Sequence, residues 1–290
     1  MTSSDLKGTP GRARTLKLRP LTGSVGVEVS GIDLNDDFDE NIANQLRDAL
    51  CGNCVMVVRD QFLSTETLLR LARIFGEPFM PSYYRKNTVE GFPDVAVVPN
   101  FGKAKAPAEG WHTDWSHMTV PPTVSVSIPT VLAPKGGDTM FSNQYESYDR
   151  LSNGMKEFLD GRRAKFIGTR PIGDDQKVVT GDDLTASAKR EDVINFHPIT
   201  PTHPHTGRKA LYLNRPGGSM VEIEGMTPAE SFPILEYLYT QSTNPDNVYR
   251  HIWEPGDVVC WDNRCAMHYG VHDYGDVERT LHRVTVGGTI

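Results

Sequence analysis

The apolar residues of this chain follow one spacing near the N-terminus and a different spacing further along. Over 40–50, Ile42, Leu46 and Leu50 recur every four residues, which gives the single apolar stripe of an amphipathic helix. A second helix is predicted to begin at Ser64, whose hydroxyl can serve as the N-cap. Later segments alternate apolar and polar residues in short runs bounded by turns, which is typical of strands. Helices early and strands late, without regular alternation, predict an α+β fold with a mostly antiparallel sheet.

Strands are predicted wherever short runs are rich in β-branched or aromatic residues. These runs occupy 16–34 (two strands around a turn), 54–58, 95–100, 123–133, 209–214, 248–253, 257–263 and 280–288. Further helices are predicted over 145–161 and 228–240. The polar stretch 162–195 shows no clear period and is interpreted as an insertion or as a lid over a site.

The composition fits a folded protein of 290 residues and excludes several classes. Hydrophobic residues make up 38% and charged residues 23%, which excludes a disordered chain or a coiled coil. A net charge of −7 argues against a general nucleic-acid binder. No apolar run approaches the ~18 residues of a membrane helix, and four cysteines do not make a disulfide scaffold.

The N-terminal segment is basic and lacks the apolar region of a secretory signal. We therefore expect residues 1–14 to be a flexible tail and residues 15–290 to form one domain. We also expect a cytoplasmic protein with free thiols and with no nucleic-acid or membrane partner.

Two segments place histidines beside other groups that bind metals. His112 and Asp114 are two residues apart, so on a strand their side chains would project from the same face. Such a pair is by itself more often an ordinary hydrogen-bonding pair than a metal site. His268, after a predicted strand, offers a third ligand. Two imidazoles and one carboxylate are the facial triad of non-haem Fe(II) oxygenases, which leaves positions open for O₂ and a chelating co-substrate.

Three neighbouring residues strengthen this interpretation. Thr139 follows a Gly-Gly turn that leads into a strand. Arg279 and Arg283 are four residues apart at the last predicted strand, a spacing that predicts a shared face. An arginine beside a metal is a suitable anchor for a carboxylate, because its guanidinium donates two parallel hydrogen bonds.

The chain resembles the TauD/TfdA family, which includes taurine dioxygenase and 2,4-dichlorophenoxyacetate dioxygenase. The motifs that carry this resemblance lie in one order between residues 16 and 288: RPLTGSVGVEVSGIDL, VVRDQFLS, RIFGEP, WHTD, GGDTMFSN, THPHTGRKALYLN, WDNRCAMHYGVHDY and RTLHRVTVGG. The resemblance implies an Fe(II)- and 2-oxoglutarate-dependent dioxygenase that uses O₂. It also implies a double-stranded β-helix (jelly roll) core with flanking helices, and a homo-oligomer, either a dimer or a tetramer.

The resemblance also implies a role for each candidate residue. The residues that it assigns to iron are His112, Asp114 and His268. It implies that Thr139 and Arg279 bind the far carboxylate of 2-oxoglutarate. Arg283 would lie at the active site, near the acid group of the substrate or the co-substrate. The implied reaction is hydroxylation of a small organic acid, coupled to decarboxylation of 2-oxoglutarate to succinate and CO₂. Where the hydroxylated carbon carries a heteroatom, that bond would then break.

The segments that select the substrate differ from those of the taurine enzyme. That enzyme has a histidine soon after its FGE motif and an asparagine just before its His-x-Asp pair, and the stretches 79–85 and 106–110 of this chain have neither. The difference argues against taurine and favours a more apolar or aromatic pocket. The candidate pocket residues are Tyr83, Tyr84, Trp115 and Met118, with Arg85, His117 and Arg215 as candidate polar contacts. Each of these seven is more often a packing or surface residue.

Two other functions use the same residues. A cupin-like binding protein would share the fold without turnover, although the complete triad and both arginines argue against it. A zinc hydrolase would need a general base beside the open position, and Glu109 is the carboxylate nearest in sequence. The pair Cys51 and Cys54, the pair Cys260 and Cys265, and the histidines His203 and His205 are interpreted as structural.

Overall fold

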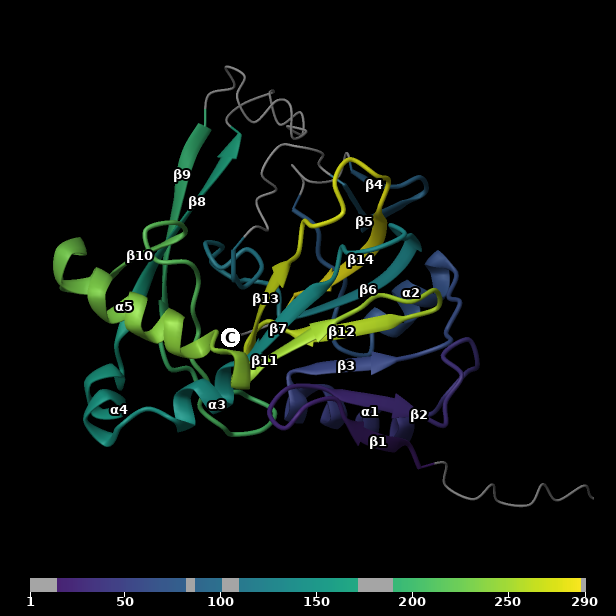
Figure 1. Cartoon of the computed structure of the whole chain (residues 1–290), viewed down its shortest axis with the longest axis horizontal. Coiled ribbons are helices and arrows are strands. Elements are labelled where there is room, and N and C mark those ends of the chain that lie inside the picture. The colour runs from purple at the N-terminus through teal and green to yellow at the C-terminus, as the bar shows by residue number, and fades with distance from the viewer. Residues whose placement is uncertain (1–14, 82–86, 101–109, 172–189, 288–290) are drawn as a thin grey trace, which may run out of the picture.

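A computed structural model describes residues 15–81, 87–100, 110–171 and 190–287. Its largest sheet has eight strands in the order β1-β2-β3-β12-β6-β14-β5-β4, and every neighbouring pair except β2 and β3 is antiparallel (Figure 1). The strands of this sheet are β1 (Lys17–Pro20), β2 (Val27–Ser30), β3 (Val55–Val58), β4 (Thr88–Val89), β5 (Phe92–Pro99), β6 (Val124–Val131), β12 (Val258–Asp262) and β14 (Thr280–Val286). The predicted α+β fold with a mostly antiparallel sheet is confirmed.

Two antiparallel three-stranded sheets complete the β structure. In one, β7 lies between β11 and β13, and in the other, β8 lies between β9 and β10. Their strands are β7 (Thr139–Asn143), β11 (Val248–His251), β13 (Ala266–Gly270), β8 (Arg163–Pro171), β9 (Arg190–Pro198) and β10 (Met220–Ile223).

The helices begin at side-chain caps. Helix α1 (Glu40–Asn53) begins after Asp39, and α2 (Thr65–Ala72) begins after Ser64, as predicted. Helix α5 (Pro228–Ser242) begins with a capping box, in which the N-cap threonine and the glutamate three residues later bond to each other's backbone. None of the helices in the described ranges is long and apolar enough to cross a membrane.

The helix predicted over 145–161 is wrong in one respect, because two helices occupy that segment. Helix α3 (Gln144–Asp149) ends before Ser152, whose side chain caps α4 (Asn153–Leu159). The apolar spacing continues across the break and therefore does not reveal it.

The central strands of the large sheet have two buried faces. In β12, Val258 and Cys260 belong to an apolar cluster shared with α1 and α2, whereas Val259 and Trp261 belong to a second cluster shared with β7 and β13. Figure 1 shows α1 and α2 against this sheet and α5 beside the β10-β8-β9 sheet. The face opposite α1 and α2 is therefore enclosed by the sheet that carries β7 and β13.

The segment interpreted as an insertion or a lid, 162–195, has strands at both of its ends. Strands β8 and β9 pair along their whole lengths, and residues 172–189 lie outside the described residues, so the interpretation as a lid stays a prediction. The strand predicted over 209–214 is absent, although the segment is buried. The N–H groups of Ala210 and Leu211 donate to the carbonyls of Pro201 and Gln144, two separate segments. The predicted tail, residues 1–14, also lies outside the described residues.

Candidate metal centre

Three side chains converge between the large sheet and β13. His112 and His268 exchange two backbone hydrogen bonds, of 3.0 and 2.9 Å, and their ring centroids are 4.1 Å apart. The Oδ1 atom of Asp114 lies 3.9 Å from His112 Nε2 and 3.7 Å from His268 Nε2. The structure therefore brings together the three residues that the sequence predicted as metal ligands.

The reason for this convergence differs from the predicted one. His112 forms an isolated bridge rather than part of a strand, and Asp114 lies in the turn that follows. Trp115 continues this turn with a φ of 42°, in the left-handed region that is uncommon for residues other than glycine. The turn, and not the alternation of a strand, directs Asp114 back towards the two imidazoles.

The hydrogen bonds and charges of the centre set its ionisation states. His112 Nδ1 lies 2.8 Å from the Gly110 carbonyl oxygen, so Nδ1 carries the proton and the lone pair of Nε2 faces Asp114. Burial lowers the pKa of both His112 and His268. Burial alone would raise the pKa of Asp114, but the Arg283 guanidinium holds it below its ordinary value. Two neutral imidazoles and a carboxylate result.

These donor atoms fit a divalent transition metal. One nitrogen or oxygen from each of the three residues lies within 4.8 Å of the others. The set contains no thiolate, and two imidazoles with one carboxylate on one side are the ligands of non-haem Fe(II) sites. The chemistry of the donor set therefore matches the predicted metal.

Thr139 begins β7 after the Gly-Gly turn, and Arg279 contacts this turn at Gly137. The Nε1 of Trp253 donates to Thr139 Oγ at 3.1 Å, so the Thr139 hydroxyl retains its own proton for another acceptor. The Nε of Arg279 donates to the Gly137 carbonyl at 3.0 Å, and Arg279 is buried. Among the described residues no carboxylate lies within 4.0 Å of this guanidinium. The arrangement offers an anion a buried cation and a hydroxyl donor.

Arg283 lies at the carboxylate of the centre rather than at this turn. Its Nη1 is 3.4 Å from Asp114 Oδ1, and its guanidinium carbon is 5.9 Å from the ring centroid of Trp261. The buried Nε of Arg283 has no hydrogen-bond partner among the described residues. Arg279 lies one residue before β14 begins, so the two arginines do not share that strand as their spacing had predicted.

The other candidates for the pocket have different surroundings. His117 is half-buried against β8, where a side chain at Gly168 would overlap its ring. Arg215 is exposed and passes beside Gly110. The ring of Trp115 contacts that of Phe79 edge to face, with centroids 6.1 Å apart. Four candidates lie outside the described residues, namely Tyr83, Tyr84, Arg85 and Glu109.

Sequence reasoning missed two buried polar residues that contact the centre. Ser125 Oγ lies 3.0 Å from Asp114 Oδ2, and Asn263 Oδ1 lies 3.4 Å from the Asp114 backbone nitrogen. A signal for Ser125 was present, because serines alternate with valines in β6, a strand with two buried faces. A polar residue on such a strand must find a buried partner.

Comparison with known proteins shows the family. Residues 17–285 match the model of the family described as "Taurine catabolism dioxygenase TauD, TfdA family". The chain therefore belongs to the TauD/TfdA family, as the sequence motifs predicted.

Individual relatives resemble the chain over most of their lengths. An alkylsulfatase of Acinetobacter baylyi is 31% identical, over 95% of this chain and 86% of the relative. An alpha-ketoglutarate-dependent sulfate ester dioxygenase of Pseudomonas putida is 29% identical, over 100% of this chain and 95% of the relative. The crystal structure of a taurine dioxygenase from Burkholderia xenovorans superposes with a TM-score of 0.79 and 31% identity, covering 95% of this chain and 90% of that one.

Proposed function

We propose that this protein is an Fe(II)- and 2-oxoglutarate-dependent dioxygenase that hydroxylates a small organic acid. The observation that carries the proposal is the convergence of His112, Asp114 and His268, with donor atoms within 4.8 Å of one another, in a member of the TauD/TfdA family. Bound iron would supply the reaction of O₂ with 2-oxoglutarate that yields succinate and CO₂ and hydroxylates the substrate.

The chain's own residues have distinct tasks in this proposal. The metal ligands are His112, Asp114 and His268. Arg279 and the Thr139 hydroxyl bind the far carboxylate of 2-oxoglutarate, which is supported by their open donors at the turn before β7. Arg283 offsets the charge of Asp114, and its Nε, which lacks a hydrogen-bond partner among the described residues, would donate to an anion of the substrate or the co-substrate.

The proposed substrates are organic acids with a carbon–heteroatom bond, and sulfate esters are the first class to test. This order is supported by the two relatives named for alkyl sulfates and sulfate esters. Hydroxylation of the carbon that carries the ester oxygen would give a product that breaks down to an aldehyde and sulfate. Sulfonates and aryloxyalkanoates are the next classes.

A screen for succinate formation tests this proposal. The protein, loaded with Fe(II), is supplied with 2-oxoglutarate, O₂ and one acid at a time. We expect succinate formation that depends on one of the acids, and we expect His112→Ala, Asp114→Ala and His268→Ala each to abolish it while the fold survives. Full activity in any of these three variants would place the iron elsewhere. Binding of an acid with no turnover under any condition would favour a cupin-like binding protein.

We further propose that residues 15–290 form one catalytic domain with a double-stranded β-helix core. The proposal is supported by the apolar cluster that the large sheet shares with β7 and β13. A cytoplasmic location and assembly into a dimer or tetramer stay predictions.

A further inference from the structure

A chain of buried hydrogen bonds ends on the carboxylate of Asp114. Asn263 Nδ2 donates to Ser125 Oγ at 3.2 Å, and Ser125 Oγ lies 3.0 Å from Asp114 Oδ2. Asn263 also accepts a hydrogen bond from the backbone N–H of Asp114, with a distance of 3.4 Å. All three residues are buried. The candidate metal ligand Asp114 is therefore hydrogen-bonded to polar residues of β6 and of the turn after β12.

The direction of each hydrogen bond in this chain follows from the groups involved. An amide NH₂ only donates, so Ser125 Oγ accepts from Asn263. The single hydroxyl proton of Ser125 then goes to Asp114 Oδ2, because a carboxylate only accepts. Oδ2 therefore accepts one hydrogen bond, from Ser125. Oδ1 is the oxygen nearer to His112 Nε2 and His268 Nε2.

We propose that Ser125 and Asn263 are positioning residues that present Oδ1 of Asp114 to the metal and keep Oδ2 as a hydrogen-bond acceptor. The inference rests on the metal centre of the proposed function and adds two residues to it. Ser125 holds the carboxylate of Asp114 in one rotation. Asn263 directs the hydroxyl proton of Ser125 by donating to its oxygen, and it holds the backbone of Asp114 by accepting from its N–H.

The turn that carries Asn263 is itself held by an ion pair between the buried Asp262 and the partly buried Arg264. Arg264 donates from Nε to Asp262 Oδ1 at 2.8 Å and from Nη2 to Oδ2 at 2.6 Å. The backbone N–H of Arg264 also donates to Asp262 Oδ1, and that of Asn263 donates to the Thr123 carbonyl. These bonds fix the residues on both sides of Asn263, so its amide can hold a defined direction.

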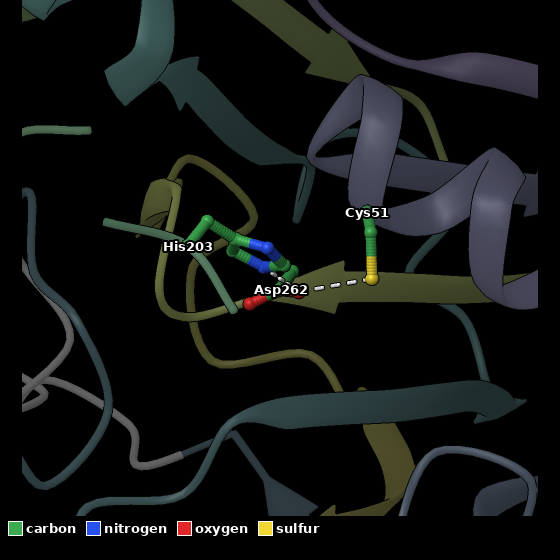
Figure 2. Close-up of side chains that lie close together, drawn as sticks. All are labelled: Cys51, His203 and Asp262. Atoms are coloured by element: carbon green, nitrogen blue, oxygen red, sulfur yellow. Dashed lines mark hydrogen bonds and ion pairs between the residues drawn. The ribbon is translucent and has the colours of Figure 1, made fainter. Parts of the chain in front are cut away.

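Cys51, His203 and Asp262 form a second group of candidate metal ligands, which helps to hold this turn. Figure 2 shows Cys51 and His203 on either side of Asp262, which accepts from His203 Nε2 at 3.0 Å and from Cys51 Sγ at 3.6 Å. His203 Nδ1 accepts from the backbone N–H groups of His205 and Thr206, so Nε2 carries the ring proton and has no lone pair to offer a metal. The group is therefore a hydrogen-bonded support and not a second metal site.

The test compares Mn(II) binding by the metal-free protein and its variants, without 2-oxoglutarate or substrate. Ser125→Ala should weaken Mn(II) binding about tenfold to hundredfold, the usual loss when the hydrogen-bond partner of a metal ligand is removed. Ser125→Cys keeps the shape of the side chain but has only a weak donor, and it should show a similar loss. Ser125→Thr keeps the hydroxyl and should recover most of the affinity.

Ser127 provides a matched control. It is buried on the same strand, two residues further along, and its hydroxyl has no hydrogen-bond partner in the described part of the chain. Ser127→Ala should therefore leave the Mn(II) affinity within about twofold, well below the loss expected at Ser125. Thermal unfolding of each metal-free variant separates a loss of metal affinity from a general loss of stability.

Asn263 provides an independent measurement on the same chain of bonds. Asn263→Ala should weaken Mn(II) binding, and the Ser125→Ala/Asn263→Ala double variant should lose less than the product of the two single losses, because the two residues act through one network. If the two losses of Mn(II) affinity multiplied, the two residues would act independently, which would contradict the proposed chain of hydrogen bonds.

Two results with the serine variants would also overturn the inference. One is wild-type Mn(II) affinity in Ser125→Ala and Ser125→Cys, and the other is an equal loss in Ser127→Ala. Turnover by the wild-type enzyme is measured separately with Fe(II). A protein whose Mn(II) affinity depends on Ser125 and Asn263, but which forms no succinate, would contradict the proposed function alone. A wild-type protein that binds no Mn(II) would contradict both.

Discussion

Arg279 is a buried cation whose partners among the described residues are a backbone carbonyl and an aromatic ring. Its Nε donates to Gly137, and its guanidinium carbon lies 5.6 Å from the ring centroid of Tyr274. Burial lowers the pKa of Arg279, although a guanidinium remains charged at neutral pH. A carboxylate is the ligand that would best satisfy such a group.

Arg279→Ala should therefore raise the KM for 2-oxoglutarate more than that for the organic substrate. Hydrogen bonds to a charged group contribute about 1.5–3 kcal/mol, which corresponds to roughly tenfold to hundredfold in binding. Arg279→Lys should recover part of this loss, because an ammonium cannot form the two parallel bonds. The two KM values are measured by titrating 2-oxoglutarate and the organic substrate separately. Arg283→Ala is expected to affect mainly the KM for the organic substrate. A larger co-substrate defect in Arg283→Ala would exchange the two roles.

Asp262 should make folding stability depend on pH. Burial would raise its pKa, but Arg264 and His203 hold the pKa below the ordinary value of a carboxyl group. A carboxylate whose pKa is lower in the folded state stabilises the fold above its unfolded-state pKa of about 3.9, and this contribution is lost as the pH falls through the folded-state pKa.

Asp262→Asn should lower the free energy of unfolding by about 3 kcal/mol at neutral pH, because it leaves the partly buried Arg264 without its carboxylate. The difference between the wild type and Asp262→Asn should shrink as the pH is lowered below about 4. Denaturant unfolding at several pH values measures it. A difference that stays constant with pH would show that the loss does not come from this charge.

Cys51→Ser should have little effect on stability or on metal content. Burial and the neighbouring Asp262 raise the pKa of the Cys51 thiol to about 12, so it is an uncharged group that donates weakly to that carboxylate. A serine hydroxyl can make the same bond, and a change of less than about 1 kcal/mol is expected. Metal analysis of both proteins is the check, and zinc that is stoichiometric in the wild type but lost in Cys51→Ser would contradict the structural role.

At the scale of elements, the turn before β7 brings Arg279 to its place. Gly137 has a φ of 76°, and a Cβ there would lie 2.8 Å from Arg279 Nε. A glycine is therefore required both by the backbone conformation and by the close approach of the arginine.

Gly137→Ala should displace Arg279 and raise the KM for 2-oxoglutarate, while Mn(II) binding stays close to that of the wild type. The metal ligands come from other segments, the bridge at His112 and strand β13. Parallel measurements of Mn(II) affinity and of the co-substrate KM separate the two effects. An equal loss in both would mean that the turn supports the whole centre.

The elements that could be predicted from the sequence have strong local signals. Helices α1, α2 and α5 have caps or regular apolar spacing, and β3, β6, β12 and β14 are rich in valine. Strand β13, which carries His268, was not predicted because its five residues contain no β-branched side chain. Its pairing with β7 is a tertiary contact, which overrides the weak local preference.

At the scale of the whole molecule, the centre is assembled from segments that are far apart in the sequence. The ligand residue types and their order could be predicted because the motifs are short and specific. The turn that directs Asp114, and the contacts of Ser125 and Asn263, depend on how β6, β12 and the segment around His112 pack together. A local pattern does not encode this packing, so the sequence predicted the ligands but not their support.

The consumption of O₂ during turnover tests the central claim most directly. With Fe(II), 2-oxoglutarate and an accepted sulfate ester, the account predicts that O₂ is consumed, and succinate and sulfate are formed, in equal amounts. No sulfate should appear when O₂ is excluded, and none should be formed by His268→Ala. Sulfate release that continues without O₂, with Zn(II) in place of Fe(II), would identify a hydrolase and contradict the account.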